Sequence, residues 1–189
     1  MSHIVFSEGR HDVDLLSLTH DRRESRNYDT FIDRESDDSQ DQRVRQHKVD
    51  LDTDYLYKAE GGRSKVIKKF RSHATEFGNV NLYLLVDFDM NGLADFANEL
   101  HQKLGDHYGD VLKVDPHRSN SNQHMEFFDC DILLDRKTHD HFKLMAFKDD
   151  LEAVTGITGS EGRAKQREKI DSYLDNTSNI YSDICDFLY

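Results

Sequence analysis

One apolar run constrains the fold of this chain more than any other segment. Residues 81–87 read Asn-Leu-Tyr-Leu-Leu-Val-Asp, and only the last of them carries a charge. A continuous apolar run is typical of a central strand in a parallel sheet, because helices cover such a strand on both faces. The run therefore predicts an α/β fold with this strand at its centre.

Shorter segments on either side of the run alternate between strand and helix patterns. Strand patterns occupy residues 4–6, 54–59 and 111–114, and helix patterns occupy residues 12–20, 64–77 and 93–104. This alternation predicts a Rossmann-like parallel sheet of about four strands, joined by right-handed crossovers and flanked by helices.

The pattern weakens after Pro116. Residues 125–134 fit either a strand or a helix. Three later segments have helical patterns, at residues 148–155, 160–174 and 179–188. We therefore expect one domain over residues 1–135 and a helical C-terminal extension over residues 136–189, packed on the same domain.

A strongly polar insertion, residues 21–54, interrupts the expected domain. It holds eleven acidic residues, seven Lys or Arg residues and few aliphatic ones. A loop of this length is uncommon inside a compact domain, and such loops are usually functional or disordered. We expect a solvated insertion with one short helix at most, near residues 40–48.

The charge balance is strongly acidic. Asp and Glu number 37 against 25 Lys and Arg, which gives a formal net charge of −12. Such a balance argues against a polyanionic partner, because most nucleic-acid-binding proteins present a basic surface. Two explanations of the excess compete. One is hydration of a halophilic protein at high salt, where self-repulsion is screened; the other is that some carboxylates are ligands.

Composition also predicts a cytoplasmic protein. The chain contains no apolar run near the roughly 18–20 residues of a membrane span, so we expect no membrane association. Its first residues lack the basic and apolar regions of a signal peptide. Cys130 and Cys185 stand far apart. They therefore indicate neither a disulfide framework nor a zinc site, which suits a reducing compartment.

Three carboxylates follow predicted strands. Glu8 follows the first strand, and Asp87 and Asp89 follow the central one. Functional groups gather at the carboxyl ends of the strands in such sheets, so these side chains should share one edge. Asp87 and Asp89 point to the same side of an extended backbone, where their like charges repel unless a cation or proton intervenes. Carboxylate oxygens of this kind suit Mg²⁺.

Asp12 allows two interpretations. It stands four residues after Glu8, where the next predicted helix begins. An Asp in this place is commonly an N-cap residue, but its side chain could instead face Glu8 as a fourth ligand. Further along, Gly92 permits a tight turn into a helix whose N-terminal N–H groups can face an anion.

Three motifs, taken in order, resemble the Toprim domain. They are Ser-Glu-Gly-Arg-His-Asp at Ser7–Asp12, Gly-Gly-Arg-Ser-Lys at Gly61–Lys65, and Asp-Phe-Asp-Met-Asn-Gly at Asp87–Gly92. Toprim domains occur in topoisomerases, primases, recombination proteins and nucleases, and carry a Glu after the first strand and an Asp-x-Asp after the third. The Glu-x-x-x-Asp spacing is more similar to overcoming-lysogenization-defect (OLD) nucleases and small stand-alone Toprim proteins. The resemblance covers residues 3–115, with the basic position only loosely matched and the insertion unmatched.

The resemblance implies a Mg²⁺- or Mn²⁺-dependent phosphoryl-transfer enzyme that acts on DNA or RNA, most simply a nuclease. Glu8 would be a metal ligand or general acid/base, and Asp87 and Asp89 would be metal ligands, with Asp12 as a further candidate. Two metals would activate water and stabilise the leaving oxygen. Candidate substrate-binding residues near the same strand ends are Gly9, Gly61, Gly62, Lys65 and Gly92.

Other functions stay open. The fold could be a non-catalytic module that binds nucleic acid or protein. It could also be a subunit of a primase, topoisomerase or defence complex, with a partner such as an ATPase. No tyrosine stands in a topoisomerase-like motif, which favours hydrolysis over strand rejoining. Asp87 and Asp89 could be merely solvated, and the basic residues of 64–77 and 160–174 could be solvated helix faces rather than nucleic-acid contacts.

Overall fold

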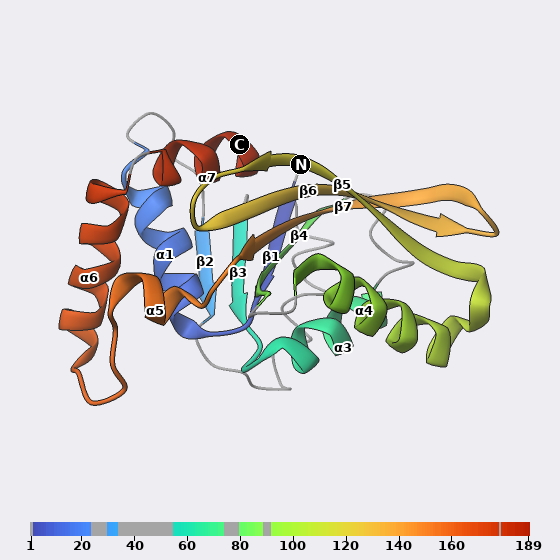
Figure 1. Cartoon of the computed structure of the whole chain (residues 1–189), viewed down its shortest axis with the longest axis horizontal. Coiled ribbons are helices and arrows are strands. Elements are labelled where there is room, and N and C mark those ends of the chain that lie inside the picture. Colours follow the sequence, from blue (N-terminus) through green and yellow to red (C-terminus); the bar gives the residue numbers. More distant parts are fainter. Residues whose placement is uncertain (1, 24–29, 34–54, 74–79, 89–91, 178) are drawn as a thin grey trace.

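A single mixed β-sheet runs through the described part of the chain. The computed structural model describes residues 2–23, 30–33, 55–73, 80–88, 92–177 and 179–189, and every structural statement below concerns these residues. The strands are β1 (Ser2–Ser7), β2 (Thr30–Asp33), β3 (Tyr55–Ala59), β4 (Val80–Asp87), β5 (Leu112–Ser121), β6 (Met125–Leu134) and β7 (Lys137–Phe147). They form one seven-stranded sheet in the order β2-β3-β1-β4-β7-β6-β5 (Figure 1).

The sheet combines a parallel part with an antiparallel edge. Strands β2, β3, β1, β4 and β7 pair in parallel. Strand β6 runs antiparallel to both β7 and β5. The carboxyl ends of β1, β4 and β7 therefore lie side by side at one edge of the sheet, which places whatever follows these strands in one neighbourhood.

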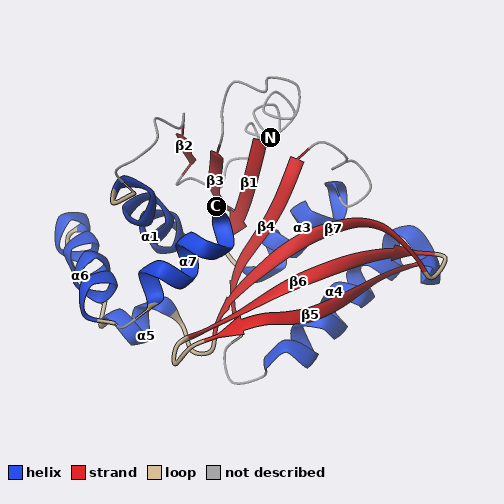
Figure 2. Cartoon of the chain, turned by 90° about the horizontal axis from the view of Figure 1, so that it is seen from above, coloured by secondary structure: helices blue, strands red, loops and turns tan. Residues whose placement is uncertain are grey.

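Helices cover both faces of the sheet. One face carries α3 (Arg63–His73) and α4 (Gly92–Tyr108), and the other carries α1 (Arg10–Asp21), α5 (Leu151–Thr155), α6 (Arg163–Asn176) and α7 (Ile180–Leu188) (Figures 1 and 2). A short 3₁₀ turn, η2 (Gly109–Val111), leads into β5. The protein is thus an α/β fold with helices on both sides of a mixed sheet. No helix in the described ranges is long and apolar enough to cross a membrane.

The central position of β4 explains its apolar sequence. Leu84 and Val86 face the core under α3 and α4, whereas Tyr83 and Leu85 face the core under α1 and α7. Because both faces are covered, the strand shows no alternation of apolar and polar residues. The predicted central strand is confirmed.

The sheet differs from the predicted one of about four parallel strands. It gains β2 within the polar insertion and β6 and β7 in the second half of the chain. The strand predicted at residues 111–114 runs in the same direction as β4 but lies at the far edge, separated from it by two strands. The rest of the insertion, residues 24–29 and 34–54, lies outside the described residues.

The predicted domain boundary after residue 135 falls inside the sheet. Asp135 and Arg136 form the turn between β6 and β7, with positive φ angles of 49° and 66°. Residues 137–147, assigned from sequence to a helical extension, form β7. The helical segment begins only at Leu151, and its three helices pack on the same sheet as α1.

Candidate functional site

The candidate site lies where β1, β4 and β7 end. Glu8 follows β1, Asp87 ends β4, and Asp150 and Glu152 follow β7 at the start of α5. Sheet order makes these three strands neighbours. Acidic side chains from both halves of the sequence thus lie at one edge of the sheet.

Asp87 carries the clearest sign of an unusual environment. Its Oδ1 atom is buried and has no hydrogen-bond partner among the described residues. Burial, reinforced by the negative charges of Asp12, Glu8 and Glu152, raises the pKa of Asp87 to about 9. Burying a carboxylate oxygen without a hydrogen-bond partner costs free energy, and such atoms are rare in native proteins. This oxygen is therefore a candidate ligand or proton-carrying atom.

Glu8 is fixed from two sides. Its Oε1 atom accepts a hydrogen bond of 3.0 Å from the backbone N–H of Asp87. Its carbonyl oxygen accepts hydrogen bonds of 2.8 and 2.7 Å from the N–H groups of Gly61 and Gly62. These two glycines have φ angles of 84° and 119°, a region that side chains disfavour. The Gly-Gly turn after β3 therefore positions the backbone of Glu8, while β4 orients its carboxylate.

Asp12 is an N3 residue, not the N-cap. Gly9 is the N-cap of α1, and its N–H donates a hydrogen bond of 2.8 Å to Asp12 Oδ2. The Asp12 side chain is buried, and this burial, together with the charges of Glu152 and Glu8, raises its pKa to about 8. The capping interaction exists, but Asp12 also lies within the electrostatic reach of the other carboxylates.

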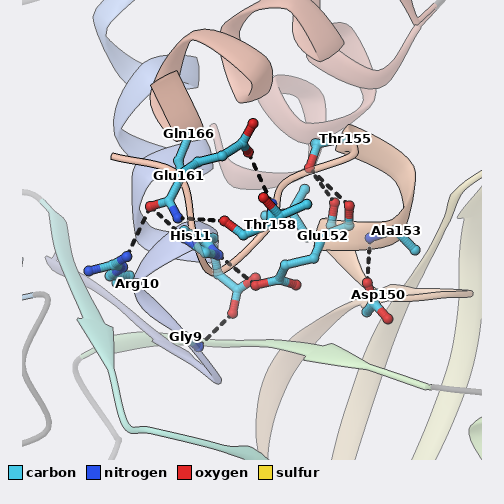
Figure 3. Close-up of polar contacts among 12 residues, drawn as sticks. Gly9, Arg10, His11, Asp150, Glu152, Ala153, Thr155, Thr158, Glu161 and Gln166 are labelled. Atoms are coloured by element: carbon cyan, nitrogen blue, oxygen red, sulfur yellow. Dashed lines mark hydrogen bonds and ion pairs between the residues drawn. The ribbon is translucent and has the colours of Figure 1, made fainter. Parts of the chain in front are cut away.

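The start of α5 connects this cluster to the C-terminal helices. Glu152 Oε1 lies 2.6 Å from His11 Nδ1. Gln166 Oε1, on α6, lies 3.3 Å from His11 Nε2 and accepts a hydrogen bond of 2.9 Å from Arg10 (Figure 3). Gln166 is buried, and its Nε2 donates to the Thr158 carbonyl, which fixes the orientation of the amide. The network holds the first turn of α1 against α5 and α6.

A buried ion pair supports the same edge next to Glu8. Lys58, in β3, and Glu60, which follows it, are joined by a contact of 2.6 Å, and their side chains are 1% and 3% exposed. Removing two charges from water is expensive, and close pairing offsets this cost only in part. This pair lies at the end of β3, directly before Gly61, and holds two charged side chains in fixed positions at this edge of the sheet.

The carboxylate oxygens at this edge suit a hard divalent cation, but the side chains do not point toward a common position where a cation could bind. Mg²⁺ prefers carboxylate oxygens, and within the described ranges Asp87 Oδ1 accepts no hydrogen bond. Glu8 Oε1 and Asp12 Oδ2, however, face backbone N–H groups. Among the described residues, no three His, Cys, Asp or Glu side chains are arranged to hold a metal ion. The chemistry of the donors therefore fits the cation, and Glu8 or Asp12 would have to reorient to join Asp87.

The remaining predicted residues divide into three groups. Asp89 lies outside the described residues. Gly9, Gly61 and Gly62 lie beside Glu8 and Asp12, as stated above. Lys65 is exposed in the first turn of α3, and Gly92, with a φ of 74°, begins α4.

No family model, no curated protein and no solved structure matches the chain.

Sequence analysis missed two acidic residues of this neighbourhood. Glu152 raises the pKa of both Asp12 and Asp87, and Asp150 raises that of Asp87. Both residues follow β7, whose last residues, Leu-Met-Ala-Phe, form a buried run that could have been recognised as a strand. The missing information was that this strand lies beside β4.

Proposed function

We propose that this protein is a divalent-metal-dependent phosphoryl-transfer enzyme that acts on nucleic acid, and that it hydrolyses phosphodiester bonds. The observation that carries the proposal is the juxtaposition of Glu8 and the buried, unpartnered Oδ1 of Asp87 at the ends of adjacent parallel strands. Strongly perturbed pKa values cluster at functional sites, and the pKa values of Asp12 and Asp87 are both raised here.

In this proposal, the strand-end carboxylates hold the cation. Asp87 would bind it, together with Glu8 or Asp12 after reorientation and with Asp89 by the Toprim resemblance. The bound cation would polarise the phosphate and lower the pKa of a coordinated water. Glu8, held by the Asp87 N–H, would orient the reacting groups or accept a proton.

The finer fold assignment belongs to the same proposal. The segment from β1 to α4 would be a Toprim-like unit, with its motifs after β1, β3 and β4. Supporting it are the parallel pairing of β1 with both β3 and β4 and the contact between the Gly-Gly turn and Glu8. Strands β5, β6 and β7 would then extend this unit into the larger mixed sheet.

The first prediction concerns cleavage. Purified protein should cut labelled DNA or RNA in the presence of Mg²⁺ or Mn²⁺ and not in EDTA. Glu8→Gln and Asp87→Asn should each slow the reaction by at least about 100-fold, because each removes a group that acts on the reacting atoms. Gel-resolved product formation on single-stranded, double-stranded and structured substrates measures the rate.

A matched control removes a carboxylate elsewhere. Asp106→Asn changes an exposed residue of α4 by the same charge and should keep full activity. Equal rates for the wild-type and Asp87→Asn proteins on every substrate, or no cleavage by either, would overturn the proposal.

A second candidate function is a non-catalytic module that binds nucleic acid or protein, alone or in a complex with a partner such as an ATPase. The observation that favours it is that Glu8 and Asp12 are engaged by backbone N–H groups rather than by each other. Calorimetry with Mn²⁺ separates the two candidates. An active centre takes up Mn²⁺ with an affinity that falls in Asp87→Asn, whereas a module of this kind does not require the metal.

A further inference from the structure

Helix α3 is a basic element in an acidic protein. Its eleven residues, Arg-Ser-Lys-Val-Ile-Lys-Lys-Phe-Arg-Ser-His, contain five Lys or Arg and no Asp or Glu. The chain as a whole carries a formal charge of −12. One short helix thus concentrates positive charge against the trend of the molecule.

Two of the charged residues of α3 are exposed on its outer face. Val66, Ile67 and Phe70 are fully buried against the sheet, whereas Lys65 and Lys68 are exposed. These two lysines stand three residues apart, so they are neighbours on the helix surface. The outer face of α3 therefore presents Lys65 and Lys68 to solvent, and we call these two residues the basic strip.

The strip begins at the candidate site. Gly62, the residue before α3, donates its N–H to the Glu8 carbonyl at 2.7 Å. Arg63, the first residue of α3, contacts Glu99 of α4 at 3.0 Å and so faces the neighbouring helix. Lys65 and Lys68 follow in the first two turns of α3, whose place in the fold is seen in Figure 1.

The other basic helix, α6, differs in how its charges are used. Arg163 and Arg167 contact Asp14 of α1, and Lys165 and Lys169 contact Glu161. Two of its four cations therefore fasten α6 to α1, and the other two pair with a residue just before α6. In α3, Arg63 pairs with Glu99, and no acidic side chain among the described residues forms an ion pair with Lys68.

We propose that the outer face of α3, centred on Lys65 and Lys68, binds the phosphate backbone of a nucleic-acid strand and guides it to the carboxylates at Glu8 and Asp87. The occupant follows from charge complementarity, since a strip of cations three residues apart suits a chain of regularly spaced phosphates. The inference rests on the proposed function for the identity of the substrate, and binding can be tested without cleavage.

The test measures binding in the Asp87→Asn background, in EDTA. Fluorescence anisotropy of a labelled single-stranded oligonucleotide, DNA or RNA, is followed between about 50 and 200 mM salt. Lys65→Gln/Lys68→Gln should weaken binding at least about fivefold at the low-salt end. It should also reduce the slope of log K against log salt by about 1.4, which is roughly 0.7 for each lost phosphate contact.

The control removes two exposed lysines of the sheet that lie outside α3. Lys113→Gln/Lys137→Gln, on β5 and β7, changes the net charge equally and should leave affinity and slope unchanged. An equal effect of both pairs, or no effect of the α3 pair, overturns the inference. If the α3 pair governs binding but no protein cleaves, the binding surface stands and the nuclease proposal fails. If the protein cleaves in a metal-dependent way but the α3 pair has no effect on binding, the nuclease proposal stands and the proposed binding surface is refuted.

Discussion

At the scale of single residues, Asp12 and Asp87 make the protein sensitive to pH. Burial and neighbouring charges raise their pKa values to about 8 and about 9, against about 4 in an unfolded chain. Between about pH 4 and about pH 8, these two carboxyls are protonated in the folded state but ionised in the unfolded state. The free energy of unfolding therefore carries no penalty from these groups below about pH 4, and it decreases as the pH rises to about 9. Asp87→Asn removes the titrating group and should stabilise the protein at pH 8 by at least about 1 kcal/mol, or about 2–4 °C.

Thermal unfolding in EDTA at pH 4, 6 and 8 measures this effect. The gain of Asp87→Asn over the wild type should be largest at pH 8 and should nearly vanish at pH 4. Asp106→Asn, which removes an exposed carboxylate, controls for the change in net charge. A gain that is constant across the three pH values would show that the mutation acts through packing instead.

The same residues show how far sequence reasoning reached. Glu8 and Asp87 could be placed together because Glu8 directly follows β1 and Asp87 ends β4, and both strands show apolar patterns in the sequence. Asp12 could not be resolved, since N-cap and N3 positions differ by one turn of backbone that sequence does not define. Asp150 and Glu152 could not be found, because their neighbourhood depends on β7 lying next to β4.

At the scale of elements, a buried charge joins α6 to α1. Asp14 is 1% exposed, and Arg163 and Arg167 approach its carboxylate to 3.6 and 3.3 Å. Arg167→Gln should destabilise the protein by about 1–2 kcal/mol. The expected cost is below the roughly 3–5 kcal/mol of a fully buried pair, because Arg167 is 32% exposed and Arg163 remains. Urea unfolding of a double-mutant cycle with Asp14→Asn should give a coupling of about 1 kcal/mol.

Arg167 supplies its own control for this cycle. Its Nη2 atom also contacts Asp21 at 3.1 Å, but the Asp21 side chain is 61% exposed. Solvent screens such a pair, so the cycle of Arg167→Gln with Asp21→Asn should give a coupling of only a few tenths of a kcal/mol, on the order of 0.3. Two equal couplings would contradict the assignment of Asp14 as the anchor of α6.

Some helices and strands are easier to predict from the sequence than others. Helices α3 and α4 were predictable because their buried residues recur at helical spacing, as Val66, Ile67 and Phe70 do. Strand β7 was harder to predict because its first residues, Lys-Thr-His-Asp-His, are mostly exposed and polar where the β6–β7 ribbon projects beyond β4. Only its last residues form a recognisable buried run, and its position beside β4 depends on contacts between residues far apart in sequence.

At the scale of the whole molecule, the acid excess is a property of the surface and of the site together. A formal charge of −12 destabilises the folded state, because folding brings the like charges closer together. Added salt screens repulsion between exposed charges beyond a Debye length of about 10 Å at 0.1 M and about 3 Å at 1 M. The buried carboxylates at Asp12 and Asp87 are screened much less, because bulk ions cannot approach them. Monovalent salt and a divalent cation should therefore stabilise the protein through different groups.

This difference yields a prediction for thermal unfolding at pH 8. Raising NaCl from about 0.1 to about 1 M should raise the unfolding midpoint of the wild type and of Asp87→Asn equally, since both keep the acidic surface. Replacing NaCl by MgCl₂ at equal ionic strength should raise the midpoint of the wild type further, because a ligand that binds only the folded state stabilises it. Asp87→Asn should lack this additional rise. An unchanged midpoint in NaCl would contradict the repulsion argument. A magnesium effect that persists in Asp87→Asn would mean that the cation acts on the surface acids and not at the ends of β1 and β4.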